Sequence, residues 1–217
     1  FNGGKYNEKY FMLRDSNTWG AKPILKLGSP DRYQYEVRWT TVLQNQLGND
    51  YHIIAEGLNG RTSTFDDPIE GAHKNGKRYL FPCLETHAPL DLVIIMLGTN
   101  DLKSRFGLTA WDIAFGAASL INVINNLSKP LYGGTPKTLL VAPPPLGKLG
   151  LLADHYAGDA EISLFLAKNF QKAARNSNST FLDCSQIVKS SDDDGVHSDK
   201  DQLHPLAMAN KALALLD

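Results

Sequence analysis

The chain has 217 residues, 42% of them hydrophobic, so we expect a single domain over residues 1–217 with a substantial core. The formal net charge of −1 argues against nucleic acid or a membrane surface as a partner, and no apolar run reaches the roughly 20 residues of a membrane span. Two cysteines, Cys83 and Cys184, are too few for a disulfide framework, so we expect two buried thiols and a cytoplasmic protein. The first residue is Phe1 rather than Met, so the sequence leaves open whether a leader peptide has been removed.

The first quarter of the chain predicts an arm, two strands and a helix. Residues 1–9 are polar, Gly-rich and without a period, which predicts a frayed arm. Tyr10–Leu13 is a short apolar run typical of a buried strand, and Lys22–Asp31, with two prolines, predicts a surface loop. Apolar residues then recur at helical spacing over Tyr35–Leu47, and Tyr51–Ala55 predicts a second strand.

The middle of the chain holds the most apolar segment. Ser63–Arg78 is polar and long for a connection, which favours a functional or partner-contacting loop, and Tyr79–His87 predicts a short helix. Leu90–Leu97 is continuously apolar rather than alternating, which indicates a central parallel strand buried on both faces. Thr109–Leu127 is an amphipathic pattern that begins at an N-cap threonine.

The last third continues the alternation of strands and helices. Thr138–Ala142 and Thr180–Cys184 predict strands, and Glu161–Arg175 predicts a helix between them. Gly147–Gly158 predicts a loop of lid or interface character, and a closing helix runs towards Leu216. This order predicts a three-layer α/β/α sandwich around a five-stranded parallel sheet.

Polar clusters follow the carboxyl ends of the predicted strands or close the last crossover. They contain Ser16, Gly60, Asn100 and the pair Asp194 and His197. Parallel strands place their carboxyl ends at one edge of the sheet, where open α/β folds bind ligands. We therefore expect these five residues to converge.

Those residue types suit nucleophilic catalysis. The Ser16 hydroxyl is a poor nucleophile at neutral pH and needs a base, for which His197 is the candidate. Asp194, three positions earlier across a glycine, can accept the other ring N–H and fix the tautomer. The backbone N–H groups of Ser16 and Gly60 and the side-chain amide of Asn100 can donate to a developing oxyanion.

Four sequence blocks carry a resemblance to a known family. They are Asp15-Ser16-Asn17-Thr18-Trp19-Gly20, Gly57-Leu58-Asn59-Gly60-Arg61-Thr62, Gly98-Thr99-Asn100-Asp101 and Asp194-Gly195-Val196-His197. In this order they resemble the SGNH (GDSL) hydrolase superfamily. The resemblance implies a flavodoxin-like SGNH hydrolase fold, and a serine esterase that cleaves short-chain acetyl or aryl esters through an acyl-enzyme on Ser16. It implies the catalytic set Ser16, Asp194 and His197, with Ser16, Gly60 and Asn100 as the oxyanion hole.

A narrower resemblance is carried by Tyr51–Thr62, Leu90–Asp101 and Val141–Leu146. These stretches resemble bacterial arylesterases that also act as acyltransferases. That branch implies a homo-oligomer and places Trp19 at the border of the active site, as a substrate-binding residue. Packing of Trp19 over its own loop is the structural alternative.

The sequence departs from the family pattern at two points. The family has glycine where this chain has Arg14, which puts activity in doubt, although every reacting group is present. A second Asp-x-x-His pattern, Asp201 and His204, follows the first. We prefer His197, because Gly195 frees its loop and because the closing helix is then longer. That choice requires the helix to begin late enough for Pro205 to fall in its first turn.

Other functions remain as alternatives. The same residues could serve an acyltransferase or a carbohydrate acetylesterase, and Arg14 could mark a catalytically impaired ester- or carbohydrate-binding protein. We expect no cofactor and no metal, because the aspartate runs lack the alternating ligand spacing of a calcium loop. The remaining histidines have no convergent partners in the sequence pattern, and we expect surface or core roles for them: His52, His73, His87 and His155.

Overall fold

A computed structural model describes residues 8–26, 28, 31–127, 134–157 and 160–214. Its centre is a parallel sheet with the strand order β2-β1-β3-β4-β5. The strands are β1 (Glu8–Arg14), β2 (Tyr51–Gly57), β3 (Leu92–Met96), β4 (Lys137–Ala142) and β5 (Thr180–Asp183). The continuously apolar segment is the central strand β3, with every residue buried, as predicted.

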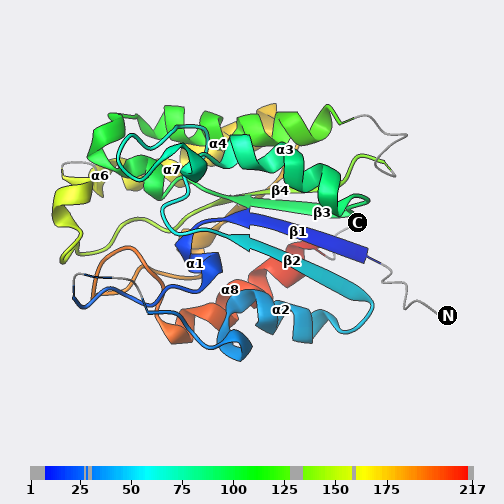
Figure 1. Cartoon of the computed structure of the whole chain (residues 1–217), viewed down its shortest axis with the longest axis horizontal. Coiled ribbons are helices and arrows are strands. Elements are labelled where there is room, and N and C mark those ends of the chain that lie inside the picture. Colours follow the sequence, from blue (N-terminus) through cyan, green and yellow to red (C-terminus); the bar gives the residue numbers. More distant parts are fainter. Residues whose placement is uncertain (1–7, 27, 29–30, 128–133, 158–159, 215–217) are drawn as a thin grey trace.

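Helices cover both faces of the sheet. They are α1 (Ser16–Trp19), α2 (Trp39–Leu47), α3 (Gly76–His87), α4 (Ala110–Asn125), α6 (Ala160–Ser163), α7 (Leu166–Asn176) and α8 (Lys200–Ala214). Figure 1 shows α3, α4 and α7 on one face and α2 and α8 on the other, which confirms the three-layer α/β/α architecture. Short 3-10 helices lie in the connections: η1 (Tyr35–Val37), η2 (Ala72–Lys74), η3 (Asn100–Leu102), η4 (Ser104–Phe106), η5 (Ala153–Tyr156) and η6 (Cys184–Gln186). No helix in the described part of the chain is both long and apolar enough to cross a membrane.

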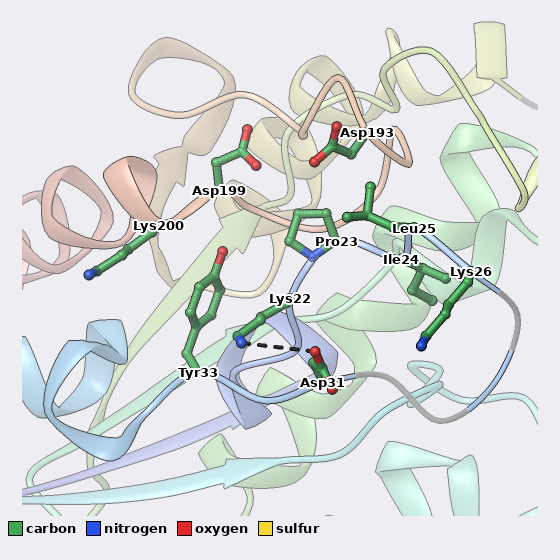
Figure 2. Close-up of a pocket in the computed structure, with 10 residues that line it drawn as sticks. All are labelled: Lys22, Pro23, Ile24, Leu25, Lys26, Asp31, Tyr33, Asp193, Asp199 and Lys200. Carbon is green, nitrogen blue, oxygen red and sulfur yellow. Dashed lines mark ion pairs between the residues drawn. The ribbon is translucent and has the colours of Figure 1, made fainter.

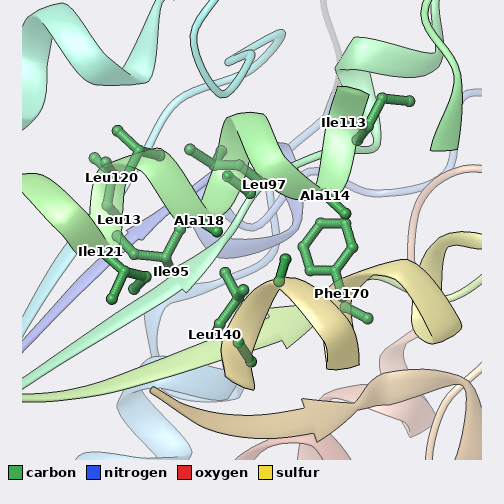
Figure 3. Close-up of a cluster of buried hydrophobic side chains, with 14 of the residues drawn as sticks. Leu13, Ile95, Leu97, Ile113, Ala114, Ala118, Leu120, Ile121, Leu140 and Phe170 are labelled. Atoms are coloured by element: carbon green, nitrogen blue, oxygen red, sulfur yellow. The ribbon is translucent and has the colours of Figure 1, made fainter. Parts of the chain in front are cut away.

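Two hydrophobic clusters hold the layers together. The larger lies under α3, α4 and α7, and Figure 3 shows Ile95 of the sheet beside Ile121 of α4, and Phe170 of α7 beside Ala114 of α4. The smaller lies on the other face, where Met12 of β1 packs with Trp39 of α2. Successive residues of a strand point to opposite faces, so β1 supplies alternate side chains to each cluster.

Several element boundaries differ from the predictions. Glu8 and Lys9 pair with β2 as part of β1 instead of belonging to an arm, while the rest of the predicted arm, residues 1–7, lies outside the described residues. The predicted helix over 161–175 is divided into α6 and α7, and the one over 35–47 into η1 and α2. The helix predicted from Tyr79 begins at Gly76, because the Asn75 side chain caps it by accepting from the N–H groups of Lys77 and Arg78.

The closing helix corrects a prediction about Pro205. Helix α8 begins at Lys200, so Pro205 lies in its second turn rather than its first. A proline there lacks the N–H that would donate to the carbonyl four residues earlier, that of Asp201. The helix nevertheless continues to Ala214, and it packs Leu203 and Leu206 into the smaller cluster.

Candidate active site

Ser16 is the first residue of α1 and lies two positions after the end of β1. The Asp15 side chain caps this short helix by accepting from the Asn17 N–H at 3.1 Å, so Asp15 holds the turn. The Ser16 carbonyl accepts from the N–H of Gly20 at 2.9 Å, which closes the turn. A side chain at Gly57 of β2 would place its Cβ 2.2 Å from the Trp19 nitrogen, so α1 lies directly on the end of β2.

Asn100 and Asp101 join the second and third loops of the rim. The Asn100 side-chain amide donates to the Arg61 carbonyl at 3.2 Å, which uses one of its two hydrogens and orients the group. Asp101 accepts from the Ser63 N–H at 3.0 Å and from the Ser63 hydroxyl at 2.5 Å. Burial raises the pKa of Asp101 to about 6, against the lowering effect of these hydrogen bonds.

Asp194 and His197 form a buried pair. The Asp194 Oδ2 lies 2.6 Å from the His197 Nδ1, and the same carboxylate accepts from the N–H groups of Val196 and His197 at 2.9 Å and of Ile24 at 2.7 Å. Burial opposes ionisation, but the hydrogen bonds and the charge of His197 outweigh it and lower the pKa of Asp194 to about 2. The carboxylate therefore stays charged and fixes the imidazole, which leaves Nε2 to face a substrate hydroxyl or a nucleophile.

Gly195 makes the turn between these two residues possible. Its φ of +73° is a conformation that side chains rarely adopt, and an added Cβ would lie 2.7 Å from the Lys148 carbonyl carbon. The Gly195 carbonyl also accepts from the Gly147 N–H at 2.8 Å. This contact joins the last loop to the 147–158 loop.

A hydrogen bond joins the turn that contains Ser16 to the loop that contains His197, across 181 positions of the sequence. The Ser198 N–H donates to the Asn17 side-chain oxygen at 2.9 Å. The structure thereby brings four of the residues singled out in the sequence to the wall of one cavity of about 160 Å³: Ser16, Gly60, Asn100 and His197. Asp194 lies directly behind the His197 ring.

Two other residues named in the sequence lie elsewhere. Trp19 does not line this cavity; the Arg32 guanidinium lies 4.4 Å from the centre of its ring, so Trp19 packs over its own loop. His204 is exposed on α8, and Asp201 accepts from Gln202 instead of a histidine. Both residues of this second Asp-x-x-His pattern belong to α8.

The cavity also uses residues that the sequence did not single out. Three come from the 147–158 loop, which was expected to be a lid or an interface: Leu152, His155 and Tyr156. His155 therefore has a convergent site, contrary to expectation. Glu70 and Lys103 line the cavity as well and form an ion pair, and Lys103 is nearly buried. No local pattern marks these residues, because distant loops bring them together.

A larger cavity of about 630 Å³ lies on the other side of Ile24 (Figure 2). Figure 2 shows Tyr33 between Lys22 and Asp199, with Lys22 and Asp31 4.0 Å apart as an ion pair. Ile24 lines both cavities, and its N–H holds Asp194. The described residues that line the larger cavity include no serine, threonine, cysteine or histidine, whereas the smaller cavity contains both Ser16 and His197.

Arg14, the departure from the family pattern, is fully buried at the end of β1. Its guanidinium lies 4.3 Å from the centre of the Trp39 ring, on the face of the sheet opposite α4. Among the described residues, none offers a hydrogen-bond partner to any of its three side-chain nitrogens. Burial lowers the pKa of Arg14 to about 10. Its carbonyl accepts from Arg61, so the backbone still serves the rim.

Comparison with known proteins agrees with this geometry. The sequence model of the GDSL-like lipase/acylhydrolase family matches residues 15–212. The native aryl esterase of M. smegmatis is 36% identical, with a TM-score of 0.89 over 96% of this chain and 100% of that one. A carbohydrate acetylesterase from Sinorhizobium meliloti is also 36% identical, with a TM-score of 0.90 over 96% and 100%.

A third similar structure is a putative arylesterase from Agrobacterium tumefaciens. It is 36% identical, with a TM-score of 0.84 over 95% of this chain and 97% of that one. A search of curated proteins finds no match.

Proposed function

Because the chain belongs to the GDSL-like lipase/acylhydrolase family and is a carboxylic ester hydrolase, we propose that it cleaves short-chain acetyl and aryl esters through an acyl-enzyme on Ser16. One observation carries the proposal. A hydroxyl, an imidazole and two oxyanion donors from four separate loops line one cavity, and a buried carboxylate fixes the imidazole.

The chemistry follows from these positions. His197 Nε2 accepts the Ser16 proton while Oγ forms a bond to the ester carbonyl carbon. The oxyanion is stabilised by the N–H groups of Ser16 and Gly60 and by the second hydrogen of the Asn100 amide. His197 then returns the proton to the leaving alkoxide, and a water molecule repeats the sequence on the acyl-enzyme to release the acid.

The size of the cavity favours a short acyl group. Its volume of about 160 Å³ is below the roughly 300–1,000 Å³ of pockets that hold drug-sized ligands. Leu152 and Tyr156 form part of its apolar wall, which suits a methyl or ethyl group. Long acyl chains would have to leave the cavity and lie in water.

The first experiment is an acyl-length series of nitrophenyl esters. We expect the highest kcat/KM for acetate, a steady fall beyond butyrate, and loss of activity in Ser16→Ala. Ser185→Ala, on η6 and away from the cavity, is the matched control and should keep wild-type rates. Undiminished hydrolysis by Ser16→Ala would refute the assignment of the nucleophile.

A second candidate substrate class is acetylated carbohydrate. A hollow of about 400 Å³ adjoins the catalytic cavity and shares Glu70 and His155 with it. Its other lining residues include Ser104, Arg105 and Asp154, which can hydrogen-bond to hydroxyl groups. We place the alcohol portion of the ester there, and a sugar would use more of these groups than a phenol would.

Asp154→Asn separates the two classes. If sugar hydroxyls bind in the hollow, KM for an acetylated monosaccharide should rise while KM for nitrophenyl acetate stays constant. Equal effects on both substrates would remove the carbohydrate candidate. Adding an alcohol to either reaction also measures acyl transfer, as a new ester formed in place of free acetate.

We propose a homo-oligomer as the working form. Tyr79 and Phe81 are exposed on α3, with 38% and 46% of their surfaces open, whereas the intervening Leu80 is buried. A monomeric mass by light scattering would contradict an oligomer. We also propose a cytoplasmic location, since both cysteines are buried and unpaired.

A further inference from the structure

A cluster of potential metal ligands lies away from the catalytic cavity, between α3 and the edge strand β2. Cys83 and His87 are one helical turn apart on α3, and Tyr79 precedes Cys83 by another turn. Residues four apart lie on the same side of a helix. Glu56, near the end of β2, faces this side, because its carboxylate contacts both Tyr79 and His87.

The distances within the cluster approach those of a coordination sphere. One ligand atom each from Glu56, Cys83 and His87 can be chosen so that all lie within 4.8 Å of one another. The His87 Nε2 is 3.7 Å from the Glu56 Oε1, and the Tyr79 hydroxyl donates to the Glu56 Oε2 at 2.8 Å. Zinc bonds of 2.0–2.3 Å place tetrahedral ligands roughly 3.5 Å apart. Side-chain rotations that move the ligand atoms by about 1 Å would therefore complete the site.

We propose that Glu56, Cys83 and His87 bind one Zn²⁺ ion, with a water molecule in the fourth position. The set combines thiolate, imidazole and carboxylate, which is a combination of donors that zinc accepts. Binding converts the Cys83 thiol to a thiolate and releases one proton to solvent. Thiolate and carboxylate together supply two negative charges to the dication.

The surroundings support the ligands. The His87 ring contacts Phe11, with 5.9 Å between ring centres, and the His87 carbonyl accepts from the Lys9 ammonium. Cys83 is nearly buried, whereas the side chains of Glu56 and His87 are 25% and 30% exposed, so an ion can enter from solvent. Arg61 is the opposing group: its guanidinium lies 4.7 Å from the centre of the Tyr79 ring, and its positive charge repels the metal.

Cobalt(II) titration of the full chain tests the site directly, after treatment with a chelator and a reductant. We expect a thiolate-to-cobalt charge-transfer band, tetrahedral d–d bands, one Co²⁺ per chain, and loss of the bands when Zn²⁺ is added. The readout is independent of ester hydrolysis, so it stands whether or not Ser16 is the nucleophile. A wild-type chain without a charge-transfer band at saturating Co²⁺ would overturn the proposal.

Variants assign the band to this cluster. Cys83→Ser should abolish it and weaken Zn²⁺ binding more than about 100-fold, since loss of an outer-shell partner alone costs 10–100-fold. Cys184→Ser, at the second buried thiol, is the matched control and should keep the band. His87→Gln, at a partly exposed position that is easier to replace, should retain the band but weaken Co²⁺ binding. A band that survives Cys83→Ser, or one that His87→Gln leaves at full affinity, would contradict the assignment.

Zinc should also stabilise the fold, because it joins α3 to the edge of the sheet. We expect added Zn²⁺ to raise the Tm of the wild type and of Cys184→Ser but not that of Cys83→Ser. An equal rise in all three would mean adventitious binding elsewhere.

Discussion

Asp194 places its two oxygens against four N–H groups, those of Ile24, Val196 and His197 and the His197 ring. The carboxylate therefore positions the imidazole and also holds the loop that contains it. These two roles can be separated by a substitution that keeps the shape and removes the charge.

Asp194→Asn should lower kcat by about 10³–10⁴-fold, because an amide that donates to the His197 Nδ1 stabilises the wrong tautomer. KM should change little. Asp193→Asn, at the exposed neighbouring position, is the control and should retain wild-type kcat. Steady-state kinetics on nitrophenyl acetate measures both, and a loss below tenfold in Asp194→Asn would contradict the assigned role.

Replacing Arg14 should stabilise the folded protein. Its buried guanidinium has no hydrogen-bond partner in the described part of the chain, and stacking on Trp39 recovers only part of the desolvation cost. Arg14→Met keeps the length and removes the charge, so we expect the free energy of unfolding to rise by about 1–3 kcal/mol.

Arg61→Met is the contrasting control for Arg14, because the buried Arg61 donates to the carbonyls of Arg14 and Glu56. This variant should lose stability. Urea denaturation compares the two, and a destabilised Arg14→Met would show that the stacking outweighs the missing partners.

At the scale of residues, motif chemistry predicted groups that line the cavity but not the contacts that hold them in place. Ser16, Asn100 and His197 stand in short local patterns, so the sequence could single them out. Ile24 acts through its backbone N–H, which carries no sequence signal. Trp19 was assigned to the substrate by resemblance, yet its contact with Arg32, 13 positions away, orients it elsewhere.

At the scale of elements, the seating of α1 on β2 decides where Ser16 stands. Gly57 and the backbone of Trp19 touch so closely that even one methyl group does not fit. The turn and the strand end therefore act as one piece.

Gly57→Ala should displace α1, since the new Cβ would lie 2.2 Å from the Trp19 nitrogen. We expect kcat to fall by about 10²-fold, the effect of misplacing a reacting group by about 1 Å. Ala55→Ser, at an exposed position of the same strand, should leave kcat unchanged. Equal rates in both variants would show that the turn adapts without moving Ser16.

Periodicity predicted each strand and most helices, but their ends depend on caps and packing. Asn75 extends α3 backwards by three residues because its side chain reaches the N–H groups of Lys77 and Arg78. Likewise, α8 continues through Pro205, since Leu203 and Leu206 bury its apolar side. Local rules penalise that proline and give no weight to the burial.

At the scale of the whole molecule, the interior carries a buried acid that makes the fold sensitive to pH. Burial raises the pKa of Asp101 to about 6 in the folded chain, above its ordinary value of 3.8. The folded state therefore binds this proton more tightly than the unfolded state does. Its contribution to stability falls as pH rises from about 4 to 6 and is constant above that.

Between pH 4.5 and 7 this single group should lower the free energy of unfolding by about 2 kcal/mol. Asp101→Asn should lose that part of the pH dependence, whereas Asp50→Asn, at an exposed loop position, should keep it. Urea denaturation at the two pH values measures the difference. Identical pH dependence in the wild type and Asp101→Asn would contradict the raised pKa.

The layer architecture and the strand edge that carries the site could be predicted at this scale, because continuous and periodic apolar patterns fix both. The zinc cluster could not: Glu56 and His87 are 31 positions apart in sequence and meet only through the packing of α3 on β2. His87 accordingly stood without partners in the sequence pattern.

The hydrogen bond between Asn17 and Ser198 has a consequence for biosynthesis. A ribosome adds about 5–20 residues per second, so the hydroxyl of Ser16 is made roughly 10–35 s before the imidazole of His197. A nascent or prematurely terminated polypeptide that stops short of this region contains Ser16 without the imidazole of His197 and without the loop that Asn17 holds.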